Sequence, residues 1–138
     1  HSPFDFIHDN REAFEKLEQG YHSDMSAASA IAPQSATDSA AVFVLPNKPW
    51  ARRVSGVYSN DLANGSPDRA HAVLTHKDNG NYLISVRAPL NNKQGADELC
   101  RQFPTGGGRA AAAGVNDLPA DALSQFIDQF TDFFTRRT

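Results

Sequence analysis

Residues 41–45 read Ala-Val-Phe-Val-Leu, a short apolar run rich in β-branched and aromatic side chains that ends at Pro46. A run of this kind is typical of a strand buried on both faces, as in the middle of an α/β sheet. Pro49 then suits the first turn of a helix, and apolar residues recur at helical spacing as far as the stop signal Asn64-Gly65. The stretch therefore predicts a buried strand followed by a helix over residues 49–64.

Two more strands are predicted downstream, at residues 70–76 and 82–86. The segment between them contains Asn79-Gly80, the dipeptide that most strongly indicates a β-hairpin turn. Since helices alternate with strands and one strand pair is a hairpin, we expect an α/β fold. It comprises a mixed sheet of about four to five strands flanked by helices.

The first 40 residues form a separate compositional region. Asp9 and Glu12 are spaced as a capping box and open a predicted amphipathic helix over residues 9–21. The segment that follows as far as residue 40 is rich in Ser and Ala, and is expected to be a connector or a weak strand around residues 27–32. We expect residues 1–40 to pack on a domain formed by residues 41–138.

Two helices are predicted in the C-terminal third of the chain. The first is capped by Asn91 or Asn92, and Pro104 ends it. The second begins at Pro119 and has the clearest apolar stripe in the chain, made of Leu123, Phe126, Ile127, Phe130, Phe133 and Phe134. Such a stripe is expected to be core, and if the sheet did not cover it, it would be an interface for a homodimer or another domain.

The composition excludes several classes of protein. The 138 residues include 13 Lys and Arg against 16 Asp and Glu, a net charge of −3, which argues against a general polyanion binder but not against one small phosphate site. The single cysteine, Cys100, excludes an internal disulfide and a multi-cysteine metal site, and we expect it to be a core residue. No 18-residue apolar run and no signal peptide are recognised, so neither a membrane span nor a leader is expected.

Three consecutive glycines, Gly106, Gly107 and Gly108, are the sharpest local feature. Arg109 follows them, and the alanines at 110–113 favour a helix. A glycine-rich loop leading into a helix N-terminus presents free backbone N–H groups to an anion, and Arg109 adds a bidentate phosphate contact. The alternative is a flexible turn before a small-residue helix that packs closely on the sheet.

Arg87 is the second candidate for a phosphate contact, because it ends the strand over residues 82–86. Ser85 shares its face of the strand, and sheet ends beside loops are where α/β folds bind ligands. An exposed strand-end arginine without a ligand is the alternative.

No catalytic or metal-binding constellation is found among the remaining residues. The five histidines are not spaced as metal ligands and are expected at the surface or in the hairpin: His1, His8, His22, His71 and His76. With no paired carboxylates and no Ser-His-Asp set, the chain is expected to be a binding domain, or part of an enzyme whose chemistry lies elsewhere.

Taken together, Ser85-Val86-Arg87, the Gly95–Cys100 segment, the run Gly106-Gly107-Gly108-Arg109 and Ala112-Ala113-Gly114 resemble the DHH-associated domain, type 1. This is the C-terminal domain of DHH-family phosphoesterases, whose pattern is a strand ending in Ser-x-Arg, a helix, then Gly-Gly-Gly-His and Ala-Ala-Gly. The resemblance covers about residues 41–135, and Arg109 stands where the family has histidine.

The resemblance implies that the chain is the substrate-binding part of a longer cytoplasmic hydrolase. Arg87, Arg109, Ser85 and the glycines at 106–108 would then face a phosphate-bearing substrate. That substrate would be a short oligonucleotide, a nucleotide or polyphosphate, and the resemblance leaves the choice open. The Asp and His residues that hold two manganese ions belong to a missing N-terminal catalytic domain, so this part alone is expected to have no enzymatic activity. A structural or dimerisation module built on the Phe-rich helix is the alternative.

Overall fold

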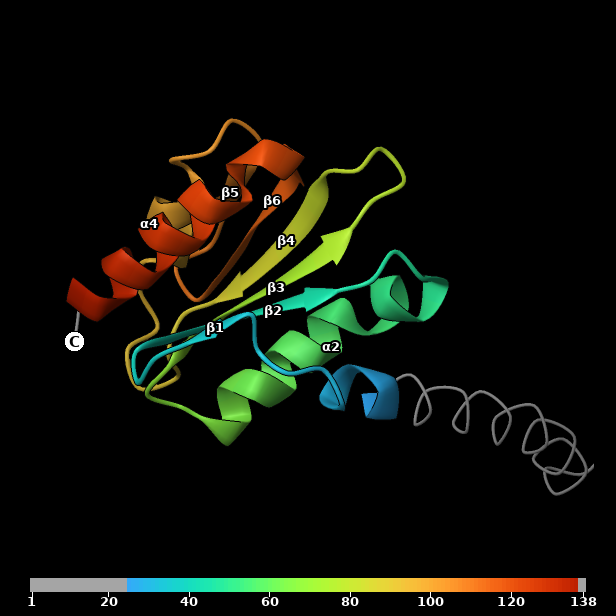
Figure 1. Ribbon diagram of the computed structural model, residues 1–138. Helices are drawn as coiled ribbons and strands as arrows, with labels where there is room; N and C mark the ends of the chain where they lie inside the picture. The colour runs from blue at the N-terminus through green and yellow to red at the C-terminus, as the bar shows by residue number, and fades with distance from the viewer. Residues whose placement is uncertain (1–24, 137–138) are drawn as a thin grey trace, which may run out of the picture.

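The computed structural model describes residues 25–136, which form one mixed sheet with helices on both faces (Figure 1). The sheet has six strands in the order β1-β2-β3-β4-β6-β5. Only β2 and β3 pair in parallel, and all other neighbours are antiparallel. The strands are β1 (Ser35–Ala36), β2 (Ala40–Leu45), β3 (Ala70–His76), β4 (Tyr82–Arg87), β5 (Gly106–Gly108) and β6 (Ala112–Leu118). The predicted α/β class, the mixed sheet and the hairpin between β3 and β4 are confirmed.

Helix α2 (Pro49–Gly65) covers one face of the sheet, packing mainly on β3 and β4. Its buried side chains meet β2 and β3 in a small cluster that includes Val54, Tyr58 and Phe43. The predicted bounds of this helix are confirmed within one residue. Five of the six residues of β2 are buried, as expected for a strand covered on both sides.

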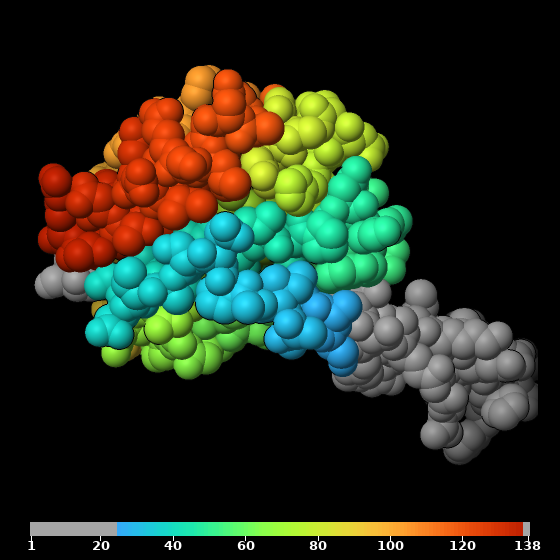
Figure 2. All heavy atoms as spheres, viewed as in Figure 1, coloured from blue at the N-terminus to red at the C-terminus, as the bar shows by residue number. Residues whose placement is uncertain are grey.

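Helices α3 (Ala96–Cys100) and α4 (Leu123–Arg136) cover the other face, and a 3₁₀ turn, η1 (Ala120–Ala122), leads into α4. Phe126, Phe130 and Phe134 are at most 1% exposed in the larger core cluster, so the predicted stripe is core. Cys100 is also fully buried there, as expected. In Figure 2, α4 lies directly beside the cyan segment that contains β1 and β2. Within residues 25–136, no helix is both long enough and apolar enough to cross a membrane.

The structure corrects three predictions of secondary structure. The glycines at 106–108, predicted as a loop, form strand β5 themselves. The alanines at 110–113, predicted as a helix, form a turn and the start of β6, because pairing with β4 and β5 outweighs the helix propensity of alanine. Residues 25–29 are helical, so the weak strand predicted near residues 27–32 is wrong.

The predictions for residues 1–24 concern a part of the chain that the structure does not describe. The helix predicted over residues 9–21, its capping box, and the histidines His1, His8 and His22 lie outside the described residues.

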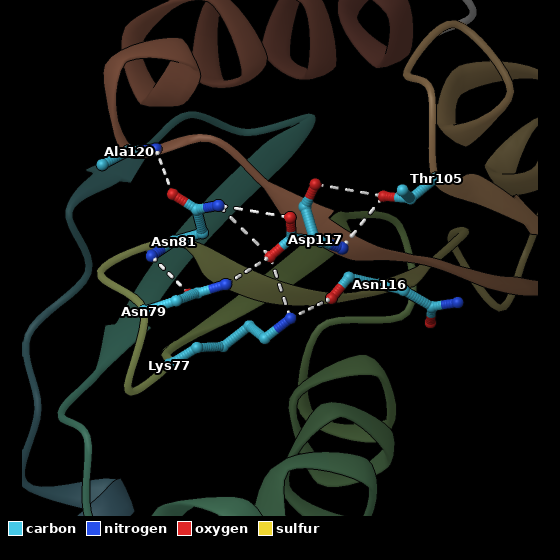
Figure 3. Close-up of polar contacts among 7 residues, drawn as sticks. All are labelled: Lys77, Asn79, Asn81, Thr105, Asn116, Asp117 and Ala120. Atoms are coloured by element: carbon cyan, nitrogen blue, oxygen red, sulfur yellow. Dashed lines mark hydrogen bonds and ion pairs between the residues drawn. The ribbon is translucent and has the colours of Figure 1, made fainter.

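A polar cluster fixes the β3–β4 hairpin to the neighbouring strand β6 (Figure 3). The pairing of β4 with β6 shifts by one residue between Ile84 and Tyr82, and this bulge places Asp117 beside the hairpin. The Asp117 carboxylate accepts hydrogen bonds from Lys77 Nζ at 2.9 Å and Asn79 Nδ2 at 3.2 Å. Asn81 contacts both the carboxylate and, through its carbonyl oxygen, the Ala120 backbone N–H. The hairpin, β6 and η1 are therefore held as one unit.

Candidate functional site

The side chains of Ser85 and Arg87 lie on the face of the sheet that α2 only partly covers. Ser85 pairs with Val73 on one side and with Gly114 on the other, and Gly114 pairs in turn with Gly107. Because α2 packs mainly on β3 and β4, the Gly114–Gly107 end of this row lies beyond the helix. A Cβ atom built on Gly107 would meet nothing within 4 Å, so the face is open at that point.

Two of the three positions in β5 require glycine, each for a different structural reason. A Cβ on Gly106 would lie 1.6 Å from the carbonyl oxygen of Cys100, so only glycine lets β5 approach α3 this closely. Gly108 has a φ of 141°, in the region that L side chains rarely adopt. Neither reason applies to Gly107. The run is thus partly explained by the close packing of β5 against α3. No helix follows it, so neither the helix N-terminal dipole nor the alternative of a turn before a small-residue helix is present.

Arg87 is held in place by residues of β4 and α2. Its Nε donates to Asn60 Oδ1 at 2.8 Å, and its NH1 group donates to Ser85 Oγ at 2.9 Å. Ser85 is linked at 3.3 Å to the fully buried Ser59, whose hydroxyl in turn lies 2.6 Å from the Ser55 carbonyl oxygen. These contacts orient the guanidinium and leave its NH2 group for a ligand. Sequence reasoning missed Asn60 and Ser59, although their positions on α2 beside β4 follow from helical spacing.

Arg109 lies in the turn between β5 and β6, where its backbone N–H donates to Ala112, the residue that pairs with Arg87. Burial lowers the pKa of Arg87, and the positive charge of Arg109 lowers it further, so the two guanidinium groups sense each other's field. Within the part of the chain that the structure describes, neither arginine forms an ion pair. Two adjacent cations without a carboxylate create a local positive potential that suits an anion.

A cavity of about 340 Å³ opens beside Arg87, at the end of the sheet where β4 finishes. Its walls come from α2, from the segment after β4 and from the start of β6: Asn60, Ala63, Asn64, Arg87, Ala88, Leu90, Lys93, Ala111 and Ala112. Of the residues predicted from sequence, only Arg87 lines it. Ser85 contributes no wall to the cavity but is hydrogen-bonded to Arg87, and neither Arg109 nor the glycines at 106–108 line it.

His71 lies next to this region in the β3–β4 hairpin, one of the two places predicted for it, but its side chain is buried and not at the surface. It pairs with Arg87 across the β3–β4 ladder and is only 1% exposed beneath α2. Burial, reinforced by the charge of Arg69, lowers the pKa of His71 to about 4. The imidazole is therefore neutral at physiological pH and adds no charge beside Arg87.

The residues described here offer no metal centre. No three His, Cys, Asp or Glu side chains among residues 25–136 lie close enough together to hold a metal ion. The donor set thus does not fit the manganese pair of a DHH catalytic domain, and no chemical step is assigned to a metal in this part of the chain.

Comparison with known proteins identifies the fold. No family model and no curated protein sequence matches the chain. Among solved structures, an exopolyphosphatase-related protein from Bacteroides fragilis matches with a TM-score of 0.58 and 16% identity, over 84% of this chain and 35% of that one. The pGpG-specific phosphodiesterase PggH from Vibrio cholerae matches with a TM-score of 0.56 and 12% identity, over 92% of this chain and 42% of that one.

The chain shares its fold with one part of these longer proteins and spans well under half of their length. At such low identity the likeness concerns the fold alone.

Proposed function

We propose that this chain is the substrate-binding domain of a DHH-family phosphoesterase and that it binds phosphate groups of its substrate through Arg87 and Arg109. The observation that carries this proposal is the pair of neighbouring guanidinium groups, one held rigidly by Asn60 and Ser85, with no acidic partner among the described residues. The two solved structures of similar fold are named as an exopolyphosphatase-related protein and a phosphodiesterase, and both names fit a phosphate ligand.

In this proposal the two arginines have different roles. Arg87 is preorganised, since its Nε and NH1 groups are already bonded to the protein and little entropy is lost when the NH2 group meets an oxyanion. Arg109 is exposed and supplies the second cation from the β5–β6 turn. A guanidinium at this position keeps its charge at any physiological pH, unlike the histidine of the family pattern.

Hydrolysis belongs, in this proposal, to a separate catalytic domain that carries the manganese ions. The residues of this chain bind and orient the substrate at the open sheet face. We expect the 138-residue chain to release no mononucleotide from a dinucleotide when Mn²⁺ is supplied. Release that depends on this chain would show that it is an enzyme by itself.

The test of the binding role is a titration of a fluorescein-labelled short oligonucleotide at low salt, followed by fluorescence anisotropy. Arg109→Ala is expected to weaken binding about tenfold or more, because a charge-assisted hydrogen bond contributes about 1.5–3 kcal/mol. Arg101→Ala is the matched control, since it removes an equal charge from an exposed arginine that pairs with Asp97. Equal weakening by both variants would mean that binding depends only on the net charge of the chain, which would contradict the proposed site.

The dimerisation alternative has lost its main support. That alternative required an apolar interface through Phe130, Phe133 and Phe134, but Phe130 and Phe134 are buried in the chain's own core and Phe133 is packed against it.

A further inference from the structure

The walls of the cavity beside Arg87 are largely apolar. Ala63 and Ala88 are buried, and Leu90 and Ala112 are partly exposed. The volume of about 340 Å³ falls in the range of small-molecule sites, roughly 300–1,000 Å³. A chain of phosphates has no apolar surface to bury there, whereas a flat heterocycle does.

The cavity also lies at the C-terminal end of α2, whereas the two cations in its lining, Arg87 and Lys93, come from β4 and the segment after it. Asn60, Ala63 and Asn64 all fall within the last turns of a helix that ends at Gly65. The carbonyl groups of a last turn carry partial negative charge, and α2 has no basic side chain in that turn. This end of the helix therefore attracts N–H donors, and an anion is favoured only on the side of the cavity that Arg87 and Lys93 line.

Two carboxamides add further hydrogen-bonding groups to the cavity. Asn60 uses its carbonyl oxygen to hold Arg87, which leaves its N–H₂ group available toward the cavity. Asn64 is exposed and its side chain has no hydrogen bond among the described residues, so the carboxamide can donate and accept at once. A carboxamide with both functions matches the edge of an amino-bearing base such as adenine.

We propose that this cavity holds the amino-bearing nucleobase of a nucleotide whose phosphate lies at Arg87 and Arg109. The proposal rests on the phosphate-binding function above and deepens it, because it makes the substrate a nucleotide or oligonucleotide end instead of polyphosphate. Arg87 lies between the proposed base site and the proposed phosphate site. It lines the cavity, and the positive charge of Arg109 lowers its pKa.

The experiment compares three ligands that carry the same phosphate dianion: methyl phosphate, AMP and IMP. Each is titrated into the 138-residue chain and followed by ¹H–¹⁵N NMR shifts, including the side-chain amide of Asn64. AMP is expected to bind at least about tenfold more tightly than methyl phosphate, since burial of the base adds to the phosphate contact. IMP, with a carbonyl in place of the amine, is expected to bind roughly fivefold more weakly than AMP.

Variants separate this inference from the proposed function. Asn64→Ala should weaken AMP binding while leaving methyl phosphate unchanged, and Asn116→Ala, an exposed asparagine outside the cavity, should alter neither. Equal affinities for AMP and methyl phosphate, or for AMP and IMP, or an Asn64→Ala variant with unchanged AMP affinity, would overturn the base site. If Arg109→Ala weakens methyl phosphate binding in those cases, the proposed function survives, and if it does not, both fail.

Discussion

Substituting alanine for Gly106 tests whether the glycine run is maintained by close packing. A Cβ at this position would lie 1.6 Å from the carbonyl oxygen of Cys100. An ordinary carbon–oxygen contact needs roughly 3.3–3.6 Å, so β5 and the end of α3 would have to separate by about 1.7 Å or more. The obstacle is a backbone atom and cannot rotate away.

The expected cost of Gly106→Ala is about 3 kcal/mol or more in the free energy of unfolding, the upper end for overpacked sites. Gly107→Ala is the matched control in the same strand, because its Cβ would meet nothing within 4 Å. That change is expected to be neutral or to stabilise by about 0.4–1 kcal/mol through the loss of chain entropy in the unfolded state. The two neighbouring variants should therefore differ by about 3–4 kcal/mol.

Urea unfolding followed by circular dichroism measures both values under one set of conditions. A Gly106→Ala protein within about 0.5 kcal/mol of wild type would refute the close approach of β5 to α3. Equal destabilisation by both variants would mean that the run is needed for backbone conformation and not for packing. Because Gly107 lies on the open face, its alanine variant also reports whether a methyl group there obstructs the ligand.

Three further perturbations probe the core and the polar cluster. Unfolded protein binds a proton at His71 near pH 6.5 whereas the folded protein does so near pH 4, so stability should fall by up to about 3 kcal/mol as the pH drops through this window. Urea unfolding at several pH values should show that the free energy of unfolding depends less on pH in His71→Phe than in wild type. An unchanged pH dependence would contradict the buried neutral imidazole. Hydrogen bonds from Lys77 lower the pKa of Asp117. The carboxylate therefore stabilises the fold fully above its ordinary pKa, and this stabilisation is lost as the pH falls through the lowered pKa. Asp117→Asn should accelerate amide hydrogen exchange in the β3–β4 hairpin, and unaltered exchange would argue against the clamp. Phe130→Ala should cost about 3–5 kcal/mol by thermal or urea unfolding and the half-buried Phe133→Ala distinctly less, whereas similar costs would contradict the packing of α4.

Local patterns predicted the elements that are set by nearby residues. The apolar run at 41–45, the proline at position 49 and the Asn79-Gly80 turn each specify a strand, a helix start or a hairpin without help from distant parts of the chain. The phenylalanine spacing of α4 likewise identified its buried face. These are the cases in which periodicity and turn chemistry agree with the tertiary environment.

The glycine run shows where such reasoning fails. Alanine favours helices, yet residues 112 and 113 are in a strand because β4 lies beside them, and that pairing spans more than twenty residues of sequence. The contact between Gly106 and Cys100 is equally invisible in the sequence. At the candidate site, Ser85 and Arg87 were predicted as neighbours, but the cavity joins Asn60, Asn64 and Lys93 to Arg87 from three separate segments. Only the assembled fold brings them together.

The sheet is bounded by two very short strands, β1 with two residues and β5 with three. Edges of this length offer too few free N–H and C=O groups to recruit a strand from another molecule. The protection depends on β5 staying in place, since the strand behind it, β6, is seven residues long. Detaching β5 from α3 would expose that longer edge. A change at Gly106 is therefore expected to reduce solubility and promote aggregation before the main core unfolds.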